Sequence, residues 1–103
     1  MYRLLVFASV GSVLLSCGVQ HTGISKARAV KAAKAYVVRV DYRGNEPLFY
    51  RNTGNRPTVV LQTTDASGQR SWFIRFDDLQ AMHEHCVHVR GSSTRVIARA
   101  ANC

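Results

Sequence analysis

The segment between Tyr36 and Phe76 decides the fold class of this chain. It contains three runs rich in β-branched and aromatic residues, YVVRVDY (36–42), TVVLQTT (58–64) and RSWFIRF (70–76). The first and third runs alternate between apolar and polar residues, which predicts β-strands with one buried face. Gly, Pro, Asn and Asp lie between the runs and predict turns. The segment therefore predicts an antiparallel sheet.

Three further segments extend the expected sheet. The run LFYR (48–51) predicts a short strand, and residues 85–90 and 95–101 predict a closing hairpin. Before this hairpin, residues 77–82 predict one or two helical turns capped by Asp77. Six short strands with regular turn signals predict a meander that forms a curled sheet or a small open barrel.

A helix is expected before the first strand. The sequence SKARAVKAAKAY (25–36) is rich in Ala and Lys, so it predicts a helix over 26–35 with Ser25 as the N-cap. The basic residues of this helix have no acidic neighbour and predict a basic surface, formed by Lys26, Arg28, Lys31 and Lys34. The predicted fold class is α+β: one N-terminal helix followed by a mostly antiparallel six-strand meander or small open barrel.

Length and composition limit the function classes. The chain has 103 residues, and 14 Lys and Arg against 6 Asp and Glu give a net charge of +8. This length excludes a TIM barrel or a dinucleotide-binding fold and allows a single domain. A charged fraction of 19% with 47% hydrophobic residues is typical of a globular chain. The sequence contains neither G-x-S-x-G nor H-E-x-x-H, so we expect no enzyme and no cofactor.

The N-terminal segment predicts export. Residues 2–16, YRLLVFASVGSVLLS, carry one charge, Arg3, before a short apolar run that ends in small residues. The run 4–15 has twelve residues, apolar apart from small Ser and Gly, and spans only about 18 Å as a helix, well below the roughly 30 Å hydrocarbon core of a bilayer. A secretory signal is therefore expected. The predicted organisation is a signal peptide over 1–16, a lipidated tether over 17–25 and one small domain over 26–103.

The end of this segment resembles the lipobox of bacterial lipoproteins. Leu14 matches the motif's leucine, Ser16 its small residue before the cleavage site, and Cys17 its lipid-bearing cysteine. The resemblance implies an N-terminal lipid that anchors the protein in a membrane. Because Gly18 rather than Asp follows the cysteine, it also implies the outer membrane, facing the periplasm. The alternative is ordinary signal-peptidase cleavage after Gly18.

Two further cysteines, Cys86 and Cys103, remain in the exported chain. An even pair in an oxidising compartment predicts a disulfide bond. A regular final hairpin that pairs Arg90 with Arg95 would set Cys86 opposite Arg99, too far from Cys103 for a disulfide. Either the C-terminus bends back, or the hairpin has another register, or the cysteines do not pair.

Histidines gather at His83, His85 and His88. A His-x-His pair on one face of a strand is a weak signal for zinc or copper, and His88 belongs to the opposite face. We favour the simpler explanation, a surface strand whose histidines are solvated while Cys86 is oxidised. The pI near 10.1 is compatible with nucleic acid, but exported proteins rarely meet it, so no nucleic acid is expected as a partner.

Taken together, these features predict a lipid-anchored bacterial envelope protein with a small protein-binding domain. We expect an accessory or assembly component of an envelope or secretion complex, whose partners are the membrane and another envelope protein. One alternative is an inhibitor, immunity or exclusion lipoprotein that blocks a periplasmic protein. A second alternative is a metal-binding protein that uses the His83–His88 cluster.

Overall fold

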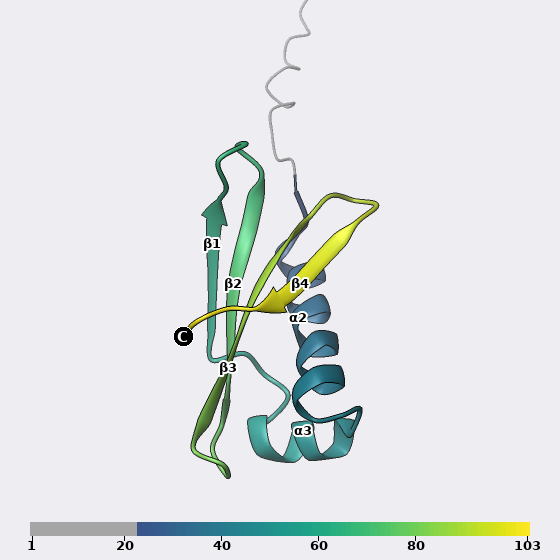
Figure 1. Ribbon diagram of the computed structural model, residues 1–103, viewed down its shortest axis with the longest axis vertical. Helices are drawn as coiled ribbons and strands as arrows, with labels where there is room; N and C mark the ends of the chain where they lie inside the picture. The colour runs from purple at the N-terminus through teal and green to yellow at the C-terminus, as the bar shows by residue number, and fades with distance from the viewer. Residues whose placement is uncertain (1–22) are drawn as a thin grey trace, which may run out of the picture.

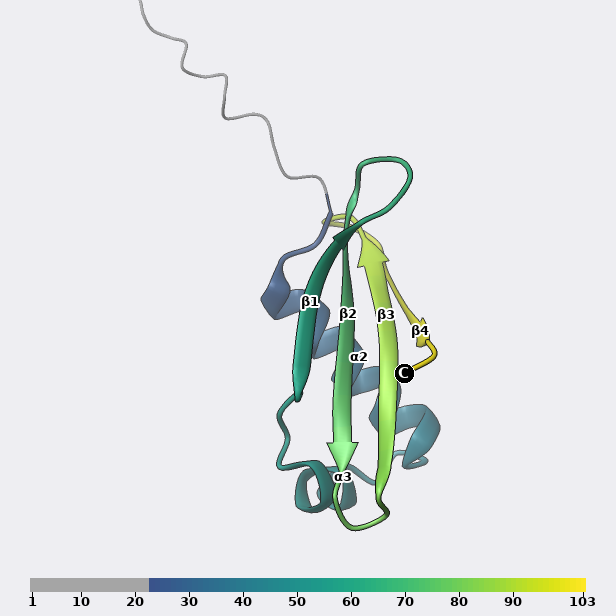
Figure 2. The ribbon, with the colours of Figure 1, turned by 90° about the vertical axis from the view of Figure 1, so that its left-hand side faces the viewer.

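The computed structural model describes residues 23–103. Two helices, α2 (Lys26–Asp41) and α3 (Glu46–Thr53), precede an antiparallel sheet with the strand order β1-β2-β3-β4. Its strands are β1 (Val59–Thr64), β2 (Arg70–Asp78), β3 (His83–Gly91) and β4 (Val96–Ala100). Both helices lie on one face of the sheet (Figures 1 and 2). The fold class is α+β, as predicted, but this part of the chain forms an open sheet of four strands instead of six.

Helix α2 covers residues 36–41 and Tyr42 is its C-cap, so the strand predicted over 36–42 is wrong. Ala29, Ala33 and Val37 recur every four residues and are completely buried against the sheet. These residues form the buried face of the helix. The free energy gained by extending this buried face by one turn outweighs the few tenths of a kcal/mol that each β-branched residue costs in a helix. The alanines also let the helix backbone approach the sheet closely.

Helix α3 replaces the strand predicted at 48–51, which is also wrong. Asn45 is the N-cap, and its side-chain oxygen accepts a hydrogen bond from the N–H of Leu48 at 3.1 Å. Pro47 occupies the first turn, where its missing N–H is not needed. Gly54 ends the helix at a φ of 71°, a left-handed conformation that glycine adopts without strain.

The core lies between the helices and the sheet. On β2, Trp72, Ile74 and Phe76 point toward the helices. On β3, Val89 lies opposite Trp72 and Val87 lies opposite Ile74. The core is completed by Ile24, Ala29, Ala33, Val37, Tyr42 and Phe49. Ile24, which the sequence places in the tether, is only 1% exposed, and its carbonyl accepts a hydrogen bond from Nε1 of Trp72 at 3.0 Å.

The helical turns predicted over 77–82 do not form. Strand β2 continues to Asp78, and a tight turn leads directly into β3. One carboxylate oxygen of Asp78 accepts hydrogen bonds from the N–H groups of Gln80 at 3.0 Å and Ala81 at 2.8 Å. Asp78, rather than Asp77, therefore stabilises the turn between β2 and β3.

The β3–β4 hairpin has a different register from the regular one considered above. Arg90 lies opposite Ile97, and Gly91 opposite Val96, a shift of two residues. A Cβ atom at Gly91 would overlap the carbonyl oxygen of Arg95, so only glycine allows this close approach.

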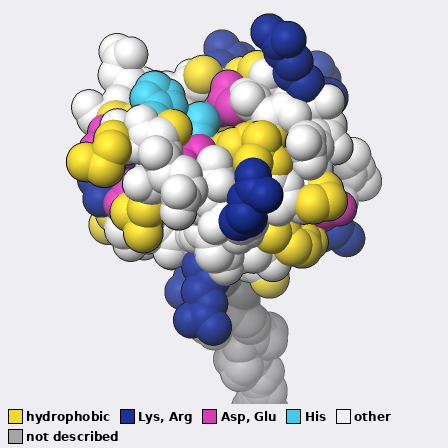
Figure 3. Space-filling view, turned by 90° about the horizontal axis from the view of Figure 1, so that it is seen from below, with side chains coloured by type: hydrophobic (Ala, Val, Ile, Leu, Met, Phe, Trp, Pro, Cys, Tyr) yellow, Lys and Arg dark blue, Asp and Glu magenta, His cyan; other side chains and the backbone are white. Residues whose placement is uncertain are grey.

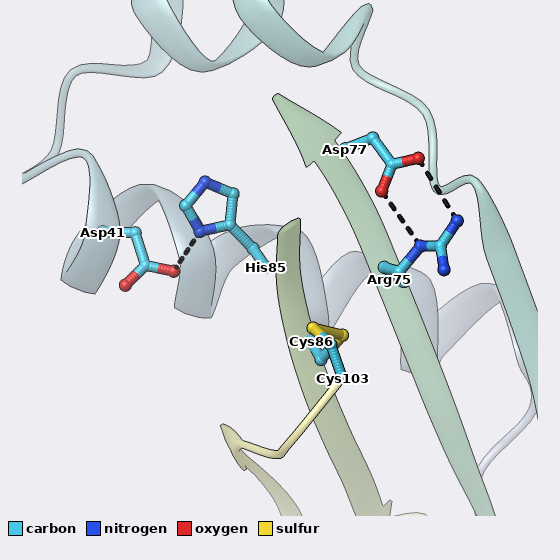
Figure 4. The surroundings of a disulfide bond; sticks show 6 residues. All are labelled: Asp41, Arg75, Asp77, His85, Cys86 and Cys103. Atoms are coloured by element: carbon cyan, nitrogen blue, oxygen red, sulfur yellow. Dashed lines mark hydrogen bonds and ion pairs between the residues drawn. A yellow bond between two sulfur atoms is a disulfide. The ribbon is translucent and has the colours of Figure 1, made fainter. Parts of the chain in front are cut away.

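The new register brings the two cysteines together. The N–H of Ala101 donates to the carbonyl of Cys86 at 2.9 Å, and the last residues then bend back across β3. The disulfide joins Cys86 to Cys103 with 5.4 Å between their Cα atoms (Figure 4). Two of the three alternatives thus hold at once: the register differs and the terminus bends.

Candidate functional site

The histidines of β3 do not converge on one point. His83 and His85 share the helix-facing side of the strand, with ring centroids 4.8 Å apart, whereas His88 lies on the opposite face. Cys86 beside them is held in the disulfide. Because strand residues alternate between faces, this cluster cannot supply three ligands from one side. Residues 23–103 contain no group of three or more His, Cys, Asp or Glu that could hold a metal ion.

His85 instead belongs to a hydrogen-bond network at the C-terminal end of α2. Its Nδ1 lies 2.9 Å from a carboxylate oxygen of Asp41 (Figure 4). Its Nε2 lies 3.1 Å from the hydroxyl of Tyr42. The same hydroxyl donates to Asp78 at 2.5 Å. The amide of Asn52 in α3 also donates to Asp78, at 3.0 Å. The network therefore ties both helices to β2 and β3.

The protonation states of the buried pair Tyr42 and Asp78 favour the hydrogen bond between them. Burial, together with the hydrogen bond to Asp78, raises the pKa of Tyr42, which keeps the hydroxyl protonated as a donor. Burial alone would raise the pKa of Asp78. Hydrogen bonds to the carboxylate outweigh this effect of burial and lower the pKa of Asp78 from 3.8 to about 2; the donors are Tyr42, Ala81, Asn52 and Gln80.

Acid should therefore weaken the fold through Asp78. Its pKa is lower in the folded than in the unfolded chain, so its stabilisation is complete above about pH 4 and is lost as the pH falls toward 2. We expect the free energy of unfolding to drop by about 2 kcal/mol over this range. Urea unfolding at pH 7, 4, 3 and 2 measures this drop in the free energy of unfolding. An Asp78→Asn variant should be less stable at pH 7 and show a flatter acid limb; equally steep acid limbs in both proteins would contradict the assignment.

The α3 end of the domain carries scattered apolar side chains. Leu79 and Met82, in the turn between β2 and β3, are 74% and 88% exposed. Figure 3 shows this end, where hydrophobic, histidine, acidic and basic side chains are mixed. Single apolar side chains are normal on protein surfaces, and charges of both signs lie between these. This end consequently has no uniform charge that would select a partner.

The predicted basic residues all lie on α2, but they are not equivalent. Lys34 approaches Glu46 at 3.5 Å and donates to the hydroxyl of Tyr50, which raises the pKa of Lys34. Its charge is thus partly matched within the domain. Arg28 donates to the carbonyl oxygens of Ser92 and Ser93 at 3.3 and 2.9 Å, which leaves its positive charge without a carboxylate partner.

A groove runs between the outer face of α2 and strand β4. Two adjoining hollows of about 520 and 380 Å³ form it. Apart from four cations its lining residues are apolar, and these apolar residues are called its floor. The residues that line this α2–β4 groove are Arg28, Lys31, Ala32, Ala35, Tyr36, Arg39, Arg95, Val96, Ile97 and Ala98. No lining residue is acidic.

The cations of the α2–β4 groove are unmatched by acids. Arg28, Lys31, Arg39 and Arg95 form no ion pair within residues 23–103. The guanidinium of Arg39 lies 5.6 Å from the ring centroid of Tyr36 on the groove floor. Such a surface favours an anionic ligand that also carries apolar groups.

The sequence alone indicates Arg28 and Lys31 but not the other half of the groove. Arg39 lies in the segment mistaken for a strand, and Arg95 and Val96 approach α2 only through the fold. The helical spacing of Lys31, Ala35 and Arg39 was the available signal, because residues four apart share one face of a helix.

Cys17 and the predicted signal peptide lie outside the described residues. Within the part of the chain that the structure describes, no helix is long and apolar enough to cross a membrane. Comparison of the chain with protein-family models, with curated proteins and with solved structures found no match.

Proposed function

We propose that this protein is a lipid-anchored component of the bacterial envelope that binds an acidic segment of another envelope protein in the α2–β4 groove. In this proposal it acts by binding, as an accessory or assembly subunit of an envelope complex. The observation that carries the proposal is the groove itself, with four cations that no acid matches beside an apolar floor.

The charge of the domain favours an acidic partner over a basic one. Residues 23–103 contain 13 Lys and Arg and 6 Asp and Glu. Opposite charges accelerate association and disfavour partners of the same sign. A second copy of this chain or a basic enzyme would therefore be repelled, whereas an acidic segment would be attracted.

The lipid would hold the groove close to the membrane surface. Five residues, 18–22, separate the proposed lipid site from Gly23, and an extended chain from Cys17 to Gly23 reaches about 20 Å. Gly23 bridges to Arg70 at the end of the sheet where α2 begins. Partners in the same membrane would thus meet the groove at a high local concentration.

Photo-crosslinking in cells tests the proposal. A benzoylphenylalanine at Ala35, which is exposed in the groove, should crosslink to an acidic envelope protein. The same probe at Thr63, which is exposed on β1, serves as the matched control and should not. Combining the Ala35 probe with Lys31→Glu and Arg95→Glu should abolish the product. Equal crosslinking from both positions, or a product that survives the charge reversal, would rule out the groove as the binding site.

A further inference from the structure

We infer that the acidic segment binds as an extended strand along the free edge of β4, which adds a fifth strand to the sheet. This inference rests on the proposed function, because it specifies how the partner lies in the same groove. It is carried by the hydrogen-bond pattern of β4 and by the small side chains beside that strand.

The outer edge of β4 offers unpaired backbone groups. Ser92 N–H donates to the carbonyl of Arg95 at 2.7 Å, and Ala101 N–H to the carbonyl of Cys86 at 2.9 Å. In an antiparallel ladder the residues that bond to the neighbouring strand alternate. The N–H and C=O groups of Val96, Ala98 and Ala100 therefore point away from β3, and β4 is the last strand of the sheet.

The surroundings of this edge leave room for another backbone. Ala32 and Ala35 form the helical side of the groove, opposite Val96 and Ala98. These short side chains leave the hollow of about 520 Å³ beside the edge. The five residues of β4 are about 17 Å long, which is enough to pair with a strand of similar length.

The charges at this edge select which strand can pair with it. Strand β4 is preceded by Arg95 and contains Arg99, and α2 adds further cations along the groove. Pairing with β4 of a second copy would bring arginines close to arginines, which is unfavourable. The other edge strand, β1, has the uncharged sequence VVLQTT and offers an acidic segment no such attraction.

A polypeptide fits these features better than a phospholipid headgroup. A headgroup supplies negative charge, but it has no series of N–H and C=O groups to match those of β4. Recognition by strand addition uses main-chain hydrogen bonds for affinity and side chains for selectivity. The edge and the cations together therefore point to an acidic peptide segment.

Peptide binding tests the inference with the full exported chain in solution. The probe is a fluorescein-labelled heptapeptide of alternating glutamate and valine, and anisotropy measures its affinity. A second peptide of the same sequence carries N-methyl groups on alternate residues, which remove the edge donors without changing the charge. We expect the N-methyl peptide to bind about tenfold more weakly, as a loss of one to two hydrogen bonds implies. Hydrogen exchange should slow at the amides of Val96, Ala98 and Ala100 when the first peptide binds.

Edge variants give an independent measurement. Ala98→Pro removes an outward N–H from β4 and should weaken peptide binding about tenfold. Gln62→Pro, at an outward position of β1, is the matched control and should leave the affinity within about twofold. Circular dichroism and thermal unfolding confirm that both variants fold. The N-methyl peptide needs no variant, so the test survives if Ala98→Pro fails to fold.

Several outcomes would overturn strand addition. Strand addition is wrong if the acidic heptapeptide does not bind, if both peptides bind equally well, or if hydrogen exchange at the three β4 amides is unchanged. Slowing of those amides by phosphatidylglycerol vesicles, or by higher protein concentration alone, would also overturn it in favour of lipid or of a second copy. In each case crosslinking from Ala35 still decides the proposed function separately.

Discussion

Removing the Cys86–Cys103 disulfide is expected to lower the free energy of unfolding by about 3 kcal/mol. The bond closes a loop with a sequence separation of 17, and the chain-entropy relation assigns a loop of this size roughly that stabilisation. A domain of about 80 residues buries only a moderate share of its surface, so this loss is a large part of its total stability. Urea unfolding of the Cys86→Ala/Cys103→Ala double variant measures the effect.

The structural consequence of this variant should be local to one edge of the sheet. The disulfide fastens the residues after β4 to β3, and β4 forms one wall of the α2–β4 groove (Figure 4). We expect amide exchange to accelerate most in β4 and affinity for the acidic heptapeptide to fall. Wild-type protein under reducing conditions is the matched control and should behave like the variant. A change in stability below about 0.5 kcal/mol would show that β4 is held by its own pairing and packing.

The wrong strand prediction at 48–51 has a local physical cause. Asn45, Pro47 and Gly54 are typical of turns, yet the same residue types begin and end helices. They flank a short apolar run in which only Phe49 is fully buried. Local sequence cannot decide between a turn and a helix cap there, because the choice depends on which side chain the sheet buries.

The segment 36–42 shows the limit of alternation as a signal. Tyr36, Val38 and Val40 alternate as in a strand, but Val37 continues the four-residue spacing of the buried alanines. Both patterns coexist in one sequence, and the helix prevails because it extends an element that has already formed. By contrast, the predictions at 58–64 and 70–76 are confirmed within two residues by β1 and β2, where β-branched and aromatic residues favour strands and no competing helix signal occurs.

The candidate site was only half visible in the sequence for a similar reason. Its helical half can be predicted from residue types alone, since a run of Lys and Arg without acidic residues indicates a basic surface. Its other half depends on the register of the β3–β4 hairpin. That register is set by Gly91, where the backbone of Arg95 approaches closely, and hairpin composition alone does not reveal it.

Replacing Cys17 with alanine should move the protein from the membrane to the soluble fraction almost completely. A diacylglyceryl group and an N-acyl chain would bury dozens of methylene groups at about 0.8 kcal/mol each, which is effectively irreversible. Intact-mass spectrometry of the membrane-purified protein should give residues 17–103 with a triacyl adduct. Disulfide reduction should add two mass units. An unlipidated mass beginning near Val19 would contradict the lipid anchor and favour ordinary cleavage.

The same variant separates anchoring from binding. Cys17 lies outside the groove in sequence, and the groove residues all fall between Arg28 and Ala98. Soluble Cys17→Ala protein should therefore bind the acidic heptapeptide with unchanged affinity, while crosslinking from Ala35 in cells should fall sharply. The Cys86→Ala/Cys103→Ala variant gives the opposite pattern, since it should stay in the membrane and lose peptide affinity. If Cys17→Ala instead abolished peptide binding in solution, the lipid itself would be part of the recognition surface, and the groove alone would not explain the partner.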